Sequence, residues 1–121
     1  MTTIDYAALA DRANREGFSV CINRPCFVPK RGYFVGGVLP PEKVIVTEHV
    51  TPEMIELTYF RAYECRRDGL YHFLGVWHAG DQKYVEVSDW FQTEFLALHA
   101  ARERGEQAVW DIVNETEIWV A

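Results

Sequence analysis

The sequence predicts an α+β domain in which about three helices pack on one face of a mainly antiparallel sheet. Two observations support this class. Three segments repeat apolar residues at the spacing of an amphipathic helix, whereas seven shorter segments are rich in β-branched and aromatic residues and are bounded by turn-forming residues. The 121 residues suit a single domain, 1–121, and the expected order of elements is α-β-β-β-α-β-β-α-β-β.

The N-terminal half is expected to hold two helices and three strands. Apolar residues recur at helical spacing over 4–16, and Gly17 is placed to end that helix. Three strands are expected next, over 18–22, 33–38 and 43–48. The basic, proline-containing stretch NRPCFVPKRG between the first two strands is predicted to be a loop. Thr51 as N-cap and Pro52 at the first helical position begin a second helix that runs to about residue 66.

The centre of the sheet is expected to be a hairpin over 71–90 with its turn at Gly80 and Asp81. This turn places His78 opposite Lys83, which puts His72 opposite Asp89. Alternation along the two strands then separates an aliphatic face, which would meet the helices, from an aromatic face. The hairpin is therefore predicted to have two chemically different sides.

The C-terminal part is expected to form one helix and a second hairpin. Apolar residues form one stripe over 91–104, and Gly105 is placed to end that helix. Strands over 108–113 and 116–120 are rich in valine, isoleucine and tryptophan and are separated by a short turn. The chain is thus expected to end on an antiparallel pair.

Composition and charge limit the classes of function. Apolar residues make up 49% of the chain and charged residues 25%, values typical of a folded globular domain. The formal net charge is −6, and the segment 61–121 holds eleven acidic residues and six basic ones. This excess of negative charge argues against direct nucleic-acid binding and favours basic protein partners.

No segment is expected to direct the chain to a membrane or out of the cell. The uncharged run 32–41 is half the length of a membrane span and is broken by glycine and proline, and no basic segment leads into an apolar one at the N-terminus. The three cysteines, Cys21, Cys26 and Cys65, are an odd number that fits free thiols in a reducing compartment. We therefore expect a cytoplasmic protein without membrane contact.

The aromatic face of the central hairpin is the candidate binding surface. Its members are Tyr71, Phe73, Trp77, Tyr84 and Glu86. Aromatic residues are enriched at protein interfaces, and a carboxylate in mid-sheet opposite a glycine would be costly to bury unpaired, which favours exposure of this face. The alternative is that the first helix or the N-terminal strands cover the face and make it part of the core.

A second candidate lies at the end of the sheet. His72 opposite Asp89 is the arrangement closest to a catalytic pair, because a carboxylate can orient an imidazole and raise its basicity. Together with Glu86 the two residues define an alternative pocket for a small enzyme or a ligand-binding domain. No nucleophile is evident beside them, and a structural pair at the rim of the sheet is the competing interpretation, so no residue is assigned a catalytic role.

Metal or cofactor binding is not indicated. The four-residue gap between Cys21 and Cys26 has no second cysteine or histidine pair at the spacing of a tetrahedral site. Asp111 stands in an otherwise apolar strand, and we expect it to pair with Arg102 or Arg104 of the preceding helix. Neither feature points to chemistry, and no cofactor is expected.

The C-terminal part of the chain carries a resemblance to a known group. GVWHAGDQKYVEVSDW, and then a helix that ends in AARERGEQAVWDIVNETEI, resemble small uncharacterised proteins encoded by phages and prophages, over about a third of the chain. In this chain Glu86 stands where that group has aspartate, and Asn114-Glu115-Thr116 replaces an Asn-Gly turn. The group has no assigned activity, so the resemblance transfers no site residue.

The resemblance implies a phage context. A compact acidic protein from such a source is expected to be a non-enzymatic binding module that inhibits or modulates a host complex, for example a bacterial defence system in the manner of anti-CRISPR proteins. The small enzyme or ligand-binding domain remains one alternative. A structural or assembly protein is another, in which a homodimer pairs through an edge strand near Trp119 and Val120.

Overall fold

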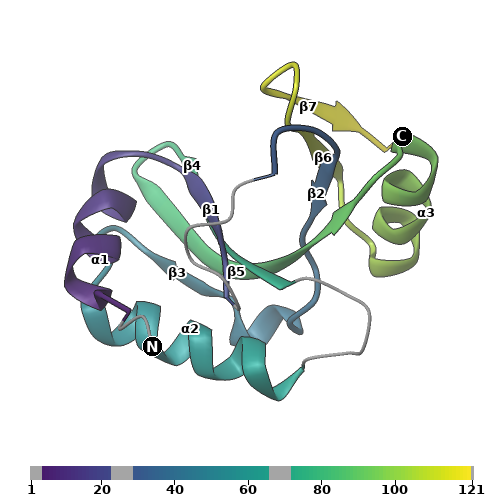
Figure 1. The fold of residues 1–121 in the computed structure, drawn as a ribbon. Coiled ribbons are helices and arrows are strands. Elements are labelled where there is room, and N and C mark those ends of the chain that lie inside the picture. The colour runs from purple at the N-terminus through teal and green to yellow at the C-terminus, as the bar shows by residue number, and fades with distance from the viewer. Residues whose placement is uncertain (1–3, 23–28, 66–71, 121) are drawn as a thin grey trace.

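The computed structural model describes residues 4–22, 29–65 and 72–120 (Figure 1). The elements follow the predicted order and confirm the α+β class. They are α1 (Tyr6–Arg15), β1 (Phe18–Cys21), β2 (Tyr33–Val35), η1 (Pro41–Lys43), β3 (Ile45–Thr47), α2 (Pro52–Glu64), β4 (His72–Ala79), β5 (Gln82–Phe91), α3 (Glu94–Arg104), β6 (Ala108–Asp111) and β7 (Thr116–Trp119). The single-turn helix η1, which begins at Pro41, was not predicted from the sequence.

The seven strands form one sheet organised around β5. The strand order is β1-β4-β5-β2-β6-β7, and β3 also pairs with β5. One edge of β5 pairs with β4 along its length, whereas the other edge is shared: β3 pairs with Val85 and its neighbours, and β2 pairs with the end near Asp89. Figure 1 shows the β1–β4 side and the β2–β6 side rising on either side of β5.

The register of the central hairpin agrees with the predicted one. His72 pairs with Asp89, Leu74 with Val87, Val76 with Val85 and His78 with Lys83, around a turn in which Gly80 adopts a positive φ of 64°. Tight hairpin turns favour glycine at such a position because it has no Cβ to clash with the backbone. The turn and the alternation of side chains were therefore sufficient to fix this register.

The helices pack on the aliphatic face of the sheet, as predicted. α1 and α2 contribute Ala13, Ile55 and Tyr59 to a core that includes Leu74 and Val85 of the hairpin. α3 packs its alanines on Val35 and Val109 in a second cluster over β2 and β6. The pairing of Val35 with Asp89 puts this second cluster on the same side of the sheet as the first. On the opposite side of the sheet, the buried cluster of Cys21, Phe34 and Phe73 includes no residue of a described helix.

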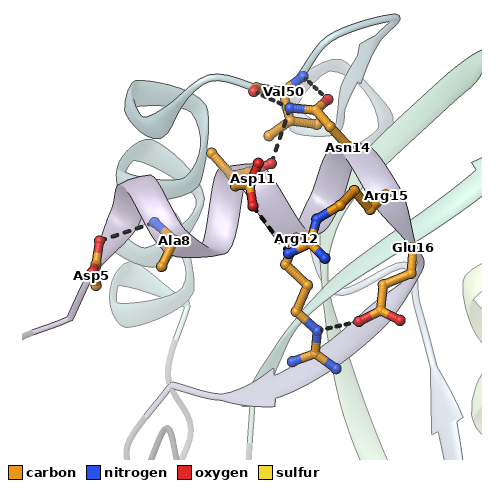
Figure 2. Close-up of polar contacts among 9 residues, drawn as sticks. Asp5, Ala8, Asp11, Arg12, Asn14, Arg15, Glu16 and Val50 are labelled. Carbon is orange, nitrogen blue, oxygen red and sulfur yellow. Dashed lines mark hydrogen bonds and ion pairs between the residues drawn. The ribbon is translucent and has the colours of Figure 1, made fainter.

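Local hydrogen bonds cap the start of α1 and join its last turn to the chain before α2 (Figure 2). Asp5 accepts a hydrogen bond from the backbone N–H of Ala8 as N-cap. Asn14 accepts from the backbone N–H of Val50 at 2.8 Å and donates to its carbonyl at 2.9 Å. An amide side chain that satisfies both backbone groups of one residue acts like a strand partner, and it fixes the spacing of α1 and α2.

One predicted ion pair is absent and is replaced by a local contact. Asp111 does not meet Arg102 or Arg104; its carboxylate accepts hydrogen bonds from the backbone N–H groups of Val113 and Asn114 in the turn that follows β6. An aspartate at the start of a turn satisfies nearby backbone donors at little entropic cost, so the local bond prevailed over the distant one.

No helix among the described residues is long and apolar enough to cross a membrane.

Candidate functional site: an aromatic and acidic cleft

The face of the sheet away from the described helices forms an aromatic cleft. This face holds a buried cluster of Cys21, Phe34 and Phe73, in which the rings of Phe34 and Phe73 meet edge to face at 4.9 Å. Trp77 of β4 and Trp110 of β6 meet at 5.9 Å with an interplanar angle of 71°. β4 and β6 are separated by two strands in the sheet, so this contact requires the sheet to curve toward its aromatic side.

Two cavities flank the contact between Trp77 and Trp110, and both tryptophans and Phe34 line each of them. The first, of about 360 Å³, is bordered by Tyr84, Glu86, Glu106 and the exposed Glu117. The second, of about 430 Å³, lies toward Phe18 and His78. Ligand sites combine aromatic walls with converging polar groups that orient the ligand, and the first cavity has both. We use the name aromatic cleft for the first cavity and its lining.

Two carboxylates converge on Gly36 at the edge of the cleft. A methyl group at Gly36 would lie 2.6 Å from Oε1 of Glu106 and closer still to Oε1 of Glu86. Glu86 comes from the middle of β5 and Glu106 from the turn between α3 and β6. The absence of a side chain at Gly36 is therefore what allows the two acids to approach each other.

This environment raises the pKa of both acids. Burial raises the pKa of Glu86 to about 7, and the nearby charge of Glu106 adds to the increase. The indole N–H of Trp77 lowers this pKa, although it does not reach the carboxylate with the geometry of an aligned hydrogen bond. Burial also raises the pKa of Glu106, against the opposing effect of the Arg104 cation. At neutral pH Glu86 is therefore only partly ionised.

Two further polar groups near the cleft lack an aligned partner. The indole N–H of Trp77 and the hydroxyl of Ser88 are buried without a hydrogen bond among the described residues. A methyl group at Gly75 would lie 3.3 Å from Trp77 Nε1 and 3.6 Å from Ser88 Oγ, so both groups border the space that this glycine leaves open. Trp77 lines the cavity and lies close enough to Glu86 to lower its pKa, whereas Ser88 lines neither cavity.

The structure brings together most of the residues predicted for the binding surface. Trp77, Tyr84 and Glu86 line the aromatic cleft, whereas Phe73 is fully buried in the cluster with Cys21 and Phe34. Tyr71 lies outside the described residues. The face is thus neither covered by a described helix nor a flat exposed platform, because its deep residues are core and its upper residues line a cavity.

Sequence reasoning missed Glu106, Trp110 and Gly36. Trp110 pairs with Phe34 and therefore lies on the same face of the sheet. Alternation along β6 was the one signal in the sequence that bears on the face Trp110 occupies. Glu106 carried no signal, since it follows the helix-ending Gly105 in a turn where a charged residue is ordinary. Gly36 carried no signal either, because a glycine after a strand is ordinary in a turn.

The alternative pocket is divided by the sheet. Glu86 lies on the aromatic side, whereas His72 and Asp89 lie on the helix side beneath α3, with exposed fractions of 1% and 2%. His72 Nδ1 is 2.6 Å from Asp89 Oδ1, a contact of ion-pair length that is not aligned as a hydrogen bond. Arg104 donates to the other oxygen of Asp89 at 2.6 Å. The three predicted residues therefore do not share one pocket.

The buried cluster of His72, Asp89 and Arg104 supports the backbone beneath the cleft. Besides binding Asp89, the Arg104 guanidinium donates to the carbonyl of Gly36 at 3.1 Å and more weakly to that of Val35. Buried paired charges of this kind fix the position of the chain segments that they join. This cluster holds Gly36 in place from the opposite side of the sheet.

Three other predictions concern a metal site, the cysteines and the edge strand near Trp119. Within 4–22, 29–65 and 72–120, no group of three histidine, cysteine or acidic side chains is arranged to hold a metal ion. Cys21 is buried and Cys26 lies outside the described residues. β7 lies at one edge of the sheet with Trp119 63% exposed, and pairing of two copies through this edge stays a prediction.

The comparisons with known proteins give no family for this chain. No protein-family model, no curated protein and no solved structure matches it. The cleft is therefore the basis on which a function is assigned below.

Proposed function

We propose that the chain is a non-enzymatic protein-binding module and that the aromatic cleft is its contact surface. The observation that carries this proposal is the grouping of Trp77, Tyr84 and Trp110 with two carboxylates around one cavity, on the side of the sheet opposite the two clusters on which the helices pack. Tryptophan and tyrosine dominate the energetics of protein interfaces, where they fill or line pockets at the centre of the contact. The acidic cleft and the net charge of −6 favour a partner with a basic surface.

The phage resemblance supports the second part of the proposal, which concerns the partner. We propose that a phage protein of this kind acts by occupying a host complex and inhibiting or modulating it. A bacterial defence system, the target of anti-CRISPR proteins, is the example that we favour. The cytoplasm of the host cell is then the place where the complex forms.

Site-specific cross-linking tests the contact surface. A photoreactive phenylalanine analogue placed at Tyr84 in the cleft is expected to cross-link one host protein in a bacterial lysate, in stoichiometric amount. The same analogue at Phe95, which is 77% exposed on α3, serves as the matched control and is expected to give no such product. Equal cross-linking from both positions, or none from Tyr84, would contradict the assignment of the cleft.

A pair of truncations completes this test. Trp110→Ala is expected to abolish capture of the cross-linked partner while circular dichroism shows the wild-type fold, because Trp110 is only partly buried. Phe95→Ala is expected to leave capture unchanged. If Trp110→Ala unfolds the protein, Tyr84→Ala replaces it, since Tyr84 also lines the cleft and is likewise partly buried.

The carboxylate pair favours a second candidate function, a small enzyme that uses acid–base catalysis. A glutamic acid with a pKa of about 7 beside a second carboxylate can donate or accept a proton near neutral pH. The Glu86→Gln variant separates the two functions. A catalytic role predicts that it retains its bound molecule longer than the wild type, because turnover stops, whereas an anchoring role predicts weaker binding.

A further inference from the structure

We infer that the group bound in the aromatic cleft is a guanidinium, presented as an arginine side chain by the partner protein and held between Glu86 and Glu106. This inference rests on the proposed binding function and names the chemistry that the cleft recognises. It follows from three observations: the cleft holds two carboxylates, its walls are aromatic, and the carboxylates converge over Gly36.

The two carboxylates of the cleft form no direct ion pair with a described residue. None of the ion pairs among the described residues includes Glu86 or Glu106. Arg104, which lies close enough to lower the pKa of Glu106, is already bound to Asp89 and to backbone carbonyls. Two acids held together without a cation between them are destabilised by their mutual repulsion, and a cation from outside relieves it.

The walls select the shape of that cation. Trp77, Trp110 and Tyr84 present aromatic surfaces around the same cavity, and a cation gains energy from contact with aromatic faces. A guanidinium is planar, so it can lie against such a face while its N–H groups point at carboxylates. An ammonium is more strongly hydrated and lacks the flat surface, so it fits this lining less well.

The two carboxylates converge over Gly36, where their oxygens occupy the position that a side chain would take. Oε1 of each acid faces the site that a Cβ of residue 36 would fill. The volume of about 360 Å³ lies near the lower limit for ligand sites and suits one side chain better than a folded segment.

Arginine binding should therefore be coupled to proton release. The titratable and polar groups that face Glu86 come from several elements: Trp77 of β4, Tyr84 of β5, Glu106 and Gln107 of the α3–β6 turn, Glu117 of β7, and Arg104 of α3 beyond Glu106. A bound cation favours the ionised form of Glu86, whose pKa in the free protein is about 7. Affinity is thus expected to rise between pH 6 and pH 8, and binding near pH 7 is expected to release a proton to the buffer.

The probes are two blocked tripeptides, acetyl-Gly-Arg-Gly-amide and the same peptide with citrulline, which has the shape of arginine without its charge. The measurement is the NMR shift of the Trp77 indole N–H during titration to roughly 20 mM, a range that detects the millimolar affinity expected of one side chain. The arginine peptide is expected to give a saturable shift with at least about tenfold higher affinity than the citrulline peptide. Equal affinities, or no shift with either peptide, would overturn the inference.

Three variants locate the binding within the cleft. Gly36→Ala displaces the two carboxylates without a change of charge, because its methyl group would collide with both, and Glu86→Gln removes one acid. Each variant is expected to weaken arginine binding by about tenfold or more. Glu56→Gln, on the exposed face of α2, is the matched control and is expected to bind as the wild type does. An unchanged affinity in both cleft variants would mean that the peptide binds elsewhere. If Gly36→Ala fails to fold, Glu86→Gln alone decides the outcome.

Different results would contradict the cleft as a contact surface and the guanidinium as its bound group. Cross-linking from Tyr84 to a single partner, combined with no preference for arginine over citrulline, would refute the guanidinium and retain the binding surface. Absence of both the cross-link and the peptide shift would refute the cleft as a contact surface. A third peptide, with lysine in place of arginine, tests whether charge alone is recognised. If it binds as well as the arginine peptide, the guanidinium assignment is contradicted.

Discussion

Two acids on the same strand have opposite surroundings. Asp89 and Glu86 are three residues apart on β5 and therefore face opposite sides of the sheet. Asp89 is 2% exposed beneath α3 and is neutralised by Arg104 at 2.6 Å, with His72 beside it. Glu86 lies in the aromatic cleft beside another carboxylate and has no ion pair among the described residues.

This contrast separates a structural acid from one that is available for binding. A buried carboxylate that already has a cation holds its surroundings together, and its charge is not free for a ligand. A carboxylate whose neighbour is a second carboxylate raises the energy of the folded protein until a cation or a proton arrives. Three mutational experiments can break or sharpen the comparison, beginning with the largest expected effect.

The largest effect is expected from removing the cation that neutralises Asp89. Arg104→Gln leaves the Asp89 carboxylate buried without its charge partner, a change that typically costs about 3 to 5 kcal/mol. The free energy of unfolding, measured by urea denaturation at pH 7, should fall by that amount. Arg102→Gln, on the exposed side of the same helix, is the control and should change stability little. A loss below about 1 kcal/mol in Arg104→Gln would show that the cluster is not structural.

An effect of opposite sign is expected at Glu86. Its pKa is raised from 4.5 to about 7 in the folded protein, so between these pH values the folded state binds more protons than the unfolded state. The stability contributed by this group is then fully present below pH 4.5 and is lost as the pH rises through 7. Glu86→Gln removes that dependence and should stabilise the protein by about 2 to 3 kcal/mol at pH 8.

The pH dependence checks the sign of this effect. Urea denaturation at pH 8 and pH 4 should show the stabilisation by Glu86→Gln at the higher pH and almost none at the lower one. Glu56→Gln, which replaces an exposed acid, should leave the pH dependence of the wild type unchanged. A Glu86→Gln variant that is less stable than the wild type at pH 8 would mean that Glu86 is held by a favourable contact, and the contrast with Asp89 would then fail.

The smallest effect is expected at the unpaired hydroxyl near the cleft. Ser88→Ala removes a buried group that has no hydrogen bond among the described residues, so the free energy of unfolding should stay the same or rise by up to about 1 kcal/mol. Thr58→Ala is the matched comparison, because the Thr58 hydroxyl is equally buried and donates to the carbonyl of Met54 at 2.8 Å. It should lose about 1 kcal/mol. A loss in Ser88→Ala equal to that in Thr58→Ala would show that the hydroxyl has a partner.

The fold was largely predictable because its signals are local. Alternation and the turn at Gly80 determined the register of the central hairpin, and Thr51 and Gly105 marked helix ends where the structure places them. The strands β2 and β3 are shorter than expected, Tyr33–Val35 against 33–38 and Ile45–Thr47 against 43–48. Each shares one edge of β5 with the other, and the sheet offers them only that much pairing.

The candidate site was predictable only where it shares a strand pair. Trp77, Tyr84 and Glu86 were assigned to one face from the register of β4 and β5 alone. Their partners Glu106 and Trp110 come from the α3–β6 region, more than fifteen residues farther along the chain. No periodicity connects two segments that meet only because a sheet curves, so the second half of the cleft could not be found from the sequence.

The sequence by itself determined the class, the order of elements and the division of the central hairpin into an aliphatic and an aromatic face. These properties depend on turn residues, helix caps and side-chain alternation, which act over a few residues. Only the tertiary structure decided which charges meet. The sheet placed Arg104 next to Asp89 rather than Asp111, and it brought Glu106 to Glu86 over Gly36, because contacts between distant segments depend on how strands pair and curve.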